Sequence, residues 1–471
     1  MFTPRKIPWA LASLSLSMLL SSLGTSIANV ALPTLAQAFS ASFQQVQWVV
    51  LAYLLAITTL IVSVGRLGDI LGRRRLLLGG ILLFTTASVL CAAAPTLALL
   101  LAARVAQGLG AATMMALTIA FVAETVPKDK TGSAMGLLGT MSAVGTALGP
   151  SLSGVLVGGF GWRSIFLVNL PLGILAFVLA QRYLPADRLV AKADRVRFDP
   201  IGTLLLALTL AAYALAMTMG RSHFGALNIA LLLAAVAGSG LFVFSQTRVA
   251  SPLVQLAAFR DPALGASLAI NVLVATVIMA TFVVGPFYLS QALGLNAATV
   301  GMVMAIGPAI SIVGGVLAGR VVDRWGAAAT VVVGLVAMAA GAVALAVLPI
   351  LFGVVGYIAA IAILTPGYQL FQAANNTAVI VDVPADQRGV VSGLLSLSRN
   401  LGLITGTSVM GAIFAFAAGT SDITTAQPEA VATGLQSTFA FAAMLLIAAV
   451  AIALVGRRSA ETKKAPGQAL F

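Results

Sequence analysis

Two stretches of the chain carry the same pattern of glycines: TVPKDKTGSAMGLLGTMSAVGTALGPSLSG at residues 125–154 and DVPADQRGVVSGLLSLSRNLGLITGTSVMG at residues 382–411. Their glycines, and a shared Val-Pro-x-Asp phrase, lie a constant 257 residues apart. Chance does not keep so many glycines in register. The agreement predicts that the chain contains two copies of one structural unit.

A second pair of phrases supports the repeat. GRLGDILGRRR at residues 65–75 is echoed by GRVVDRWG at residues 319–326, 254 residues later. The difference of three residues between the two offsets is accounted for by a loop of different length. Parallel repeats of this kind build membrane transporters with a binding site near the bilayer midplane.

The composition places these copies in a membrane. Of the 471 residues 60% are hydrophobic and 8% are charged, with a mean hydropathy of +1.07, whereas soluble domains carry about 25% charged residues. Cutting the chain into apolar stretches of about 20 residues, the length that crosses a bilayer, predicts fourteen spans. We therefore expect an all-α integral membrane protein with two six-helix pseudo-repeats, spans 1–6 and 9–14, and two inserted helices, spans 7 and 8.

The spans predict four regions. They are an N-terminal six-helix bundle (1–184), a basic cytoplasmic linker with two inserted helices (185–255), a C-terminal six-helix bundle (256–456) and a basic cytoplasmic tail (457–471). Most of the 26 Lys and Arg residues fall in loops on the N-terminal side of the membrane, which predicts that both termini are cytoplasmic. The net charge of +13 is spread in short clusters between spans, which indicates contact with membrane lipids and no nucleic acid.

The motifs resemble those of the major facilitator superfamily, and within it the fourteen-span drug:proton antiporter family. GRLGDILGRRR resembles the signature between spans 2 and 3, RVAQGLG (104–110) that of span 4, and GTMSAVGTALGPSLSG (139–154) the antiporter motif. The resemblance implies a multi-pass protein of the bacterial inner membrane, a monomer without cofactor. It further implies export of amphipathic small molecules by alternating access in exchange for protons. A proton-coupled importer of a small solute, or an exporter of a lipid-like neutral or anionic cargo, would share the fold.

Charged groups at span ends and glycines inside spans are candidates for gating. Asp69 is expected beside the start of span 13, where a carboxylate is favoured by the helix dipole, and Asp323 is expected at the equivalent place near span 5. The alternative is that such charges only anchor the topology, which we favour for the arginines. The gating candidates are Gly65, Asp69, Arg73, Arg74, Asp323, Arg324, Gly145, Gly149, Pro150, Gly402 and Gly406.

Two arginines lie inside spans, where a charge is costly and needs a partner or a water-filled cavity. Arg104 lies about 10 Å deep in span 4 and Arg399 about 16 Å into span 13, at 1.5 Å per residue. Arg104 either faces cargo or is a structural arginine satisfied by backbone carbonyls. The cavity candidates are Ser22, Thr25, Asn29, Arg104, Gln107, Tyr288, Gln291, Gln369, Gln372, Asn376 and Arg399.

The sequence departs from the family at one position. Relatives carry an aspartate in span 1, and Gly24 stands at that place; no Asp or Glu falls in the middle third of any predicted span. The cargo is therefore expected to be neutral or anionic, and Glu124 and Asp69 are the candidates for proton coupling. With one His, one Cys and no HExxH, GxSxG or phosphate-binding GxxxxGK[ST] sequence, neither an enzyme, a metal site nor ATP-driven transport is expected.

Overall fold

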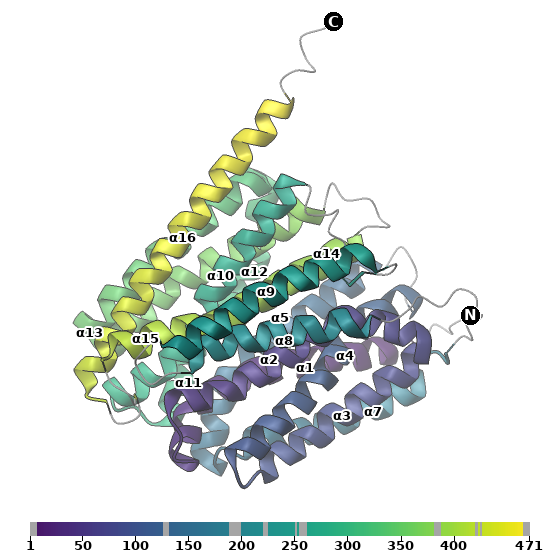
Figure 1. The fold of residues 1–471 in the computed structure, drawn as a ribbon, viewed down its shortest axis with the longest axis horizontal. Coiled ribbons are helices and arrows are strands. Elements are labelled where there is room, and N and C mark those ends of the chain that lie inside the picture. The colour runs from purple at the N-terminus through teal and green to yellow at the C-terminus, as the bar shows by residue number, and fades with distance from the viewer. Residues whose placement is uncertain are drawn as a thin grey trace, which may run out of the picture. The chain divides into compact units, whose positions relative to one another are not determined.

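The computed structural model is all-helical (Figure 1). The chain divides into two compact units. It describes residues 7–125, 131–187, 199–219, 225–249, 252–253, 261–380, 388–419, 423 and 426–464. Unit 1 comprises residues 1–254 and 295–305, and unit 2 comprises residues 255–294 and 306–471. The short segment 295–305, which the sequence assigns to the C-terminal bundle, thus packs with the first unit.

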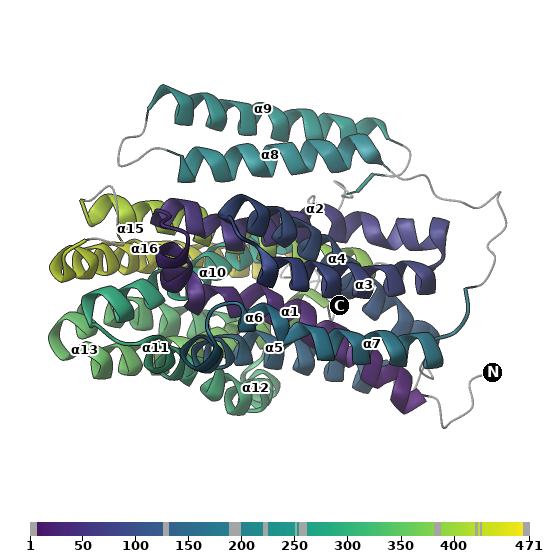
Figure 2. The same ribbon diagram turned by 90° about the horizontal axis from the view of Figure 1, so that it is seen from below.

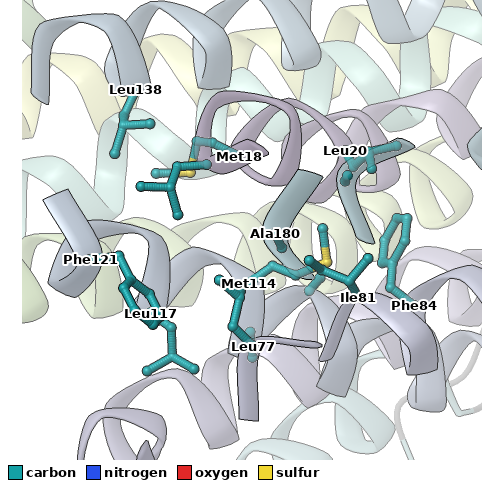
Figure 3. Packing of buried hydrophobic residues seen from close by; sticks show 14 of the residues in the cluster. Met18, Leu20, Leu77, Ile81, Phe84, Met114, Leu117, Phe121, Leu138 and Ala180 are labelled. Atoms are coloured by element: carbon teal, nitrogen blue, oxygen red, sulfur yellow. The ribbon is translucent and has the colours of Figure 1, made fainter. Parts of the chain in front are cut away.

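Unit 1 holds the helices up to residue 254 and one short later helix. They are α1 (Ile7–Ala38), α2 (Phe43–Leu71), α3 (Arg73–Ala93), α4 (Leu97–Thr125), α5 (Thr131–Phe160), α6 (Ser164–Leu167), α7 (Asn169–Tyr183), α8 (Pro200–Thr218), α9 (Ala226–Arg248) and α11 (Ala297–Met304). Side chains from α1, α3, α4 and α7 form one apolar core, including Met18, Ile81, Phe84 and Phe121 (Figure 3). Burial of these side chains fixes the bundle that carries the polar groups described below.

Unit 2 holds the remaining helices. They are α10 (Pro262–Phe287), the π-helix η4 (Tyr288–Ala292), α12 (Ile306–Trp325), α13 (Ala327–Ile380), α14 (Arg388–Thr405), the π-helix η5 (Gly406–Met410), α15 (Gly411–Ala417) and α16 (Pro428–Lys464). α16 continues through Lys464, so the first half of the predicted tail 457–471 extends the last helix.

The 54-residue helix α13 contains two predicted spans. Its backbone leaves the helical region at Gly353, with φ 54° and ψ −129°, which a residue without a β-carbon adopts at little cost. Gly341 packs on Leu364 and Gly367 on Met338, so the two halves of α13 run antiparallel to each other. α13 therefore supplies two membrane crossings.

Fourteen spans and an all-helical membrane fold are confirmed. Eleven helices among the described residues are long and apolar enough to cross a bilayer, and two shorter apolar segments lie at residues 144–160 and 297–311. Since α13 supplies two crossings, these elements correspond to the predicted spans.

The internal repeat appears in the helix contacts of each unit. A β-carbon on Gly110 of α4 would lie 2.7 Å from the backbone nitrogen of Phe84 in α3. A β-carbon on Gly367 would lie equally close, 2.7 Å, to the backbone nitrogen of Met338. These residues are counterparts at the offsets found in the sequence, and each pair brings two backbones into direct contact. The glycine register therefore encodes the same helix crossing twice.

The inserted helices α8 and α9 form a hairpin whose two ends are fastened by buried polar groups. Asn228 Nδ2 donates to the carbonyl of Ala216 at 2.7 Å, where α8 ends and α9 begins. At the other end Gln246 Nε2 donates to Asp199 Oδ2 at 2.8 Å, and Asp199 caps α8 through the backbone N–H of Gly202 at 2.8 Å. Each bond gives a polar group a hydrogen-bond partner, which the apolar interior of a bilayer cannot supply.

This hairpin lies beside α2 (Figure 2). Trp48 Nε1 donates to Thr218 Oγ1 at 3.0 Å, and the hydroxyls of Ser63 and Thr203 are 2.9 Å apart. The two bonds lie near opposite ends of α8. The inserted pair is therefore attached to unit 1 by specific side chains on α2.

Candidate functional site

Arg104 is the centre of a polar network inside unit 1. Its side chain is fully buried. Its Nε donates to the carbonyl of Val49 at 2.7 Å, its Nη2 to the carbonyl of Gly24 at 3.1 Å and its Nη1 to Gln107 Oε1 at 2.7 Å. The guanidinium lies 4.2 Å from the ring centre of Tyr53, a favourable cation–π distance.

The network reaches a further helix through Gln107. Gln107 Nε2 donates to Ser88 Oγ of α3 at 2.7 Å, and Ser88 Oγ in turn contacts the carbonyl of Phe84 at 2.8 Å. Arg104 and Gln107 thus join α4 to α1, α2 and α3. This arrangement favours a structural role for Arg104 over cargo binding, because each guanidinium nitrogen already donates to a protein acceptor.

Tyr53 fills the space beside Gly24, the position of the family's aspartate. The Tyr53 hydroxyl donates to the carbonyl of Ser21 at 2.7 Å. A β-carbon on Gly24 would lie 2.6 Å from this hydroxyl oxygen, closer than van der Waals contact allows. The ring of Tyr53 therefore requires glycine at this position.

The other predicted polar residues of α1 have local partners. The hydroxyls of Ser22 and Ser142 are 2.7 Å apart and join α1 to α5. Thr25 Oγ1 donates to the carbonyl of Ser21 at 3.3 Å, and Asn29 Nδ2 to that of Thr25 at 3.3 Å. The Oδ1 atom of Asn29 is buried without a partner in the described structure.

The predicted polar residues of unit 2 fall into two groups. Tyr288 is buried, and its hydroxyl donates to the carbonyl of Pro349 at 2.8 Å, so it holds η4 against α13. The others are Gln291, Gln369, Gln372, Asn376 and Arg399, which are half-buried and make no hydrogen bond or ion pair within the described part of the chain. In a bilayer such groups need water or a ligand.

The candidate gating glycines lie at close helix crossings. A β-carbon on Gly145 would meet the carbonyl oxygen of Leu19 in α1, and one on Gly402 would lie 2.5 Å from the carbonyl oxygen of Val272 in α10. Gly149 packs one turn further along α1, and Gly406, the first residue of η5, packs one turn further along α10. Pro150 lies inside an unbroken α5.

The candidate charged gates are only partly described. Gly65 and Asp69 lie in α2 and Glu124 in α4, at positions whose side chains are outside the described structure, as are the expected latch partners Lys130 and Asp386. Asp323 and Arg324 are exposed at the end of α12, and Arg73 is half-buried in the first turn of α3.

Asp187 makes a contact that the sequence analysis missed. Its carboxylate accepts from the backbone N–H groups of Arg74 at 2.7 Å and Arg75 at 3.2 Å, at the N-terminus of α3. Gly72, which has a φ of 94°, leaves room for this carboxylate. Asp187 belongs to the segment after α7, over 110 residues away in sequence, so no local pattern could have indicated the contact.

The chain belongs to the Major Facilitator Superfamily, whose model matches residues 14–407. It is a membrane transport protein and not an enzyme. The repeated helix crossings described above agree with this family assignment.

Several curated relatives cover most of the chain. It is 31% identical over 405 residues to riboflavin transporter RibZ of Clostridioides difficile (85% of this chain, 86% of the relative). It is 33% identical over 425 residues to drug efflux pump JefA of Mycobacterium tuberculosis (88% and 81%). The fold also matches the inward-facing crystal structure of a bacterial homologue of the lysosomal transporter Spinster, with a TM-score of 0.71, 16% identity and 97% and 98% of the chains covered.

Proposed function

We propose that this protein is a fourteen-span antiporter of the inner membrane that exports amphipathic small molecules by alternating access, in exchange for protons. The observation that carries the proposal is the glycine face of α5, where Gly145 and Gly149 bring the backbone into contact with α1. This face coincides with the antiporter motif recognised in the sequence. Similarity to drug efflux pumps supports the same direction of transport.

The repeat places an equivalent close helix crossing in unit 2. Gly402 and Gly406 of unit 2 bring α14 and η5 equally close to α10. Backbones in such contact pack closely, because no side chain lies between them. Each unit then moves as a body during alternating access, with Asp69 and Asp323 as the cytoplasmic latches.

The proton-carrying group is proposed outside the buried network of unit 1. Gly24 and Tyr53 occupy the place of the family's acid, and Arg104 is paired with backbone carbonyls. Glu124 and Asp69 remain the candidates for proton coupling. Asp69→Asn is expected to lower transport without lowering membrane abundance, and a loss of abundance alone would refute the gating role.

Import is the second candidate, because one relative is a riboflavin transporter. Inside-out and right-side-out vesicles, each with an imposed pH gradient, separate the two. An exporter accumulates a fluorescent probe in inside-out vesicles when their lumen is acidic, and an uncoupler abolishes the accumulation. Accumulation confined to right-side-out vesicles, or indifference to the pH gradient, contradicts the proposal.

A further inference from the structure

We infer that Arg399 binds the negatively charged group of an amphipathic anionic cargo, and that unit 2 therefore supplies charge recognition. This inference rests on the proposed function, since it names the class of cargo for the same transporter. Carboxylates and sulfonates attached to an apolar ring system are the expected chemistry.

Arg399 lies in the interior of α14 and has no polar partner in the described part of the chain. Its side chain is half-buried, and it makes no hydrogen bond or ion pair with any described residue. The neighbouring Asn400 is 8% exposed, and its Nδ2 is buried with no acceptor. A guanidinium presents five N–H donors in a planar fork that matches a carboxylate or sulfonate. Two adjacent residues thus offer donors that the fold itself leaves unused.

The repeat shows what is unusual about this position. The counterpart of Arg399 in unit 1 is Ser142, whose hydroxyl lies 2.7 Å from that of Ser22. Gly145 contacts the β-carbon of Ser22, and its counterpart Gly402 contacts that of Ala275. The side chain of Ala275 has no polar atom, so it cannot contact Arg399 in the way that Ser22 contacts Ser142 in unit 1.

No acid in the neighbouring helices neutralises Arg399. α14 packs against α10 and α13, and neither those two helices nor α14 itself contains Asp or Glu. An unpaired charge within a span is costly, because the bilayer offers it neither water nor a counter-charge. The counter-charge that removes this cost must therefore come from outside these three helices, and an anionic cargo supplies it.

The amide face of α13 fits the rest of such a cargo. Gln369, Gln372 and Asn376 are three and seven residues apart, so they share one helical face, and none has a hydrogen-bond partner in the described structure. Gln369 lies beside Gly314 of α12, with 3.6 Å between its Cγ and a β-carbon built on that glycine. Amides donate and accept, so they suit neutral polar groups of varied cargo.

Arg104 differs from Arg399 in every respect that matters for binding. It is fully buried, each of its nitrogens donates to a protein acceptor, and Tyr53 covers its face. The charge preference of the transporter is therefore expected to follow Arg399 alone.

The test uses proteoliposomes and two probes that differ by one charged group, 8-anilinonaphthalene-1-sulfonate and the neutral N-phenyl-1-naphthylamine. Arg399→Gln is expected to lower the initial rate for the sulfonate about ten- to a hundredfold, the range for one charge-assisted hydrogen-bonded contact. The rate for the neutral probe should stay within twofold. Arg399→Lys should retain part of the sulfonate transport. Arg248→Gln removes the same charge from an exposed position of α9 and should change neither rate.

Each outcome has one meaning. Equal losses for both probes in Arg399→Gln, with a melting temperature like that of the unsubstituted protein, overturn anion binding by Arg399 but leave export intact. If Arg399→Gln fails to fold, the ratio of sulfonate to neutral transport is read in Arg399→Lys. A lower ratio than in the unsubstituted protein supports the inference, because lysine keeps the charge but not the planar fork. An unchanged ratio contradicts it. Transport of neither probe by the unsubstituted protein overturns the proposed function, and this inference with it.

Discussion

Replacing Gly24 by alanine is expected to destabilise unit 1 through a single contact. The added β-carbon would lie 2.6 Å from the hydroxyl oxygen of Tyr53 and 3.0 Å from the ring carbon that bears it. The ring cannot withdraw freely, because its hydroxyl donates to the carbonyl of Ser21 and its face lies 4.2 Å from the Arg104 guanidinium. The substitution therefore moves the whole polar network.

The magnitude follows from two opposing effects. Overpacking by one methyl group in a close-packed site costs about 1–3 kcal/mol. Alanine in place of glycine within a helix returns about 0.5–1 kcal/mol. The net expectation for Gly24→Ala is a loss of roughly 0–2.5 kcal/mol, whereas an unhindered Gly→Ala change in a helix stabilises.

Thermal unfolding of the purified protein measures this effect, with two further variants to identify its cause. Gly79 of α3 has no heavy atom within 4 Å of a built β-carbon, so Gly79→Ala should raise the melting temperature. Tyr53→Phe removes the clashing oxygen, and in the double variant Gly24→Ala should cost at least about 1 kcal/mol less than it does alone. A Gly24→Ala protein as stable as Gly79→Ala, or strictly additive effects in the double variant, would refute the reasoning.

Three further predictions concern separate contacts. Arg104→Lys loses at least one hydrogen bond to a carbonyl, at about 1.5–3 kcal/mol for each such bond, so folded yield should fall while the ratio of anionic to neutral transport in the surviving protein stays constant. Gly301→Val should destabilise the protein by about 1–3 kcal/mol, since its β-carbon would lie 2.5 Å from the Cα of Gly154 in α5; a matched change at exposed Gly240, which has no such neighbour, should be tolerated. Asp187→Ala removes the cap of α3 and should cost about 1 kcal/mol, seen as faster hydrogen exchange in the first turn of α3 and unchanged exchange in α9.

The fold was predictable because glycines record helix crossings in the sequence itself. Gly110 and Gly367 stand 257 residues apart; Gly110 touches the backbone of α3, and Gly367 touches the backbone of the first half of α13. Small residues are kept where backbones meet, whatever the rest of the helix does. A register of glycines therefore predicts packing directly, whereas hydropathy predicts only that a segment crosses the bilayer.

The partners of buried polar groups were not predictable in the same way. Arg104 is held by the carbonyls of Gly24 and Val49, and every residue has a carbonyl, so no residue type marks these acceptors. Tyr53 lies in an apolar stretch that contains no motif, so the sequence did not indicate it as a site residue. Its hydroxyl and ring nevertheless explain why Gly24 stands in α1. The depth of an arginine can be calculated from the sequence, but whether its donors are used depends on three helices at once.

The division of the chain also depends on contacts that no local signal contains. α11 packs along α5, with Gly154 and Gly301 at the crossing, while the continuous chain on either side of it belongs to unit 2. A boundary drawn from sequence follows the order of spans and so misses an eight-residue helix that packs elsewhere.

The two copies have diverged in what their polar groups do, and this bears on mechanism. In unit 1 the hydroxyls of Ser22 and Ser142 contact each other, and Arg104 donates to two backbone carbonyls and to Gln107, although Asn29 Oδ1 of the same unit is buried without a partner among the described residues. In unit 2, Arg399 and the amides of α13 keep their donors free of protein partners among the described residues. A buried donor with no partner is tolerated only where something else pays its desolvation cost. Under the proposed role of Arg399, charge recognition falls to unit 2, although the two copies share the same helix crossings.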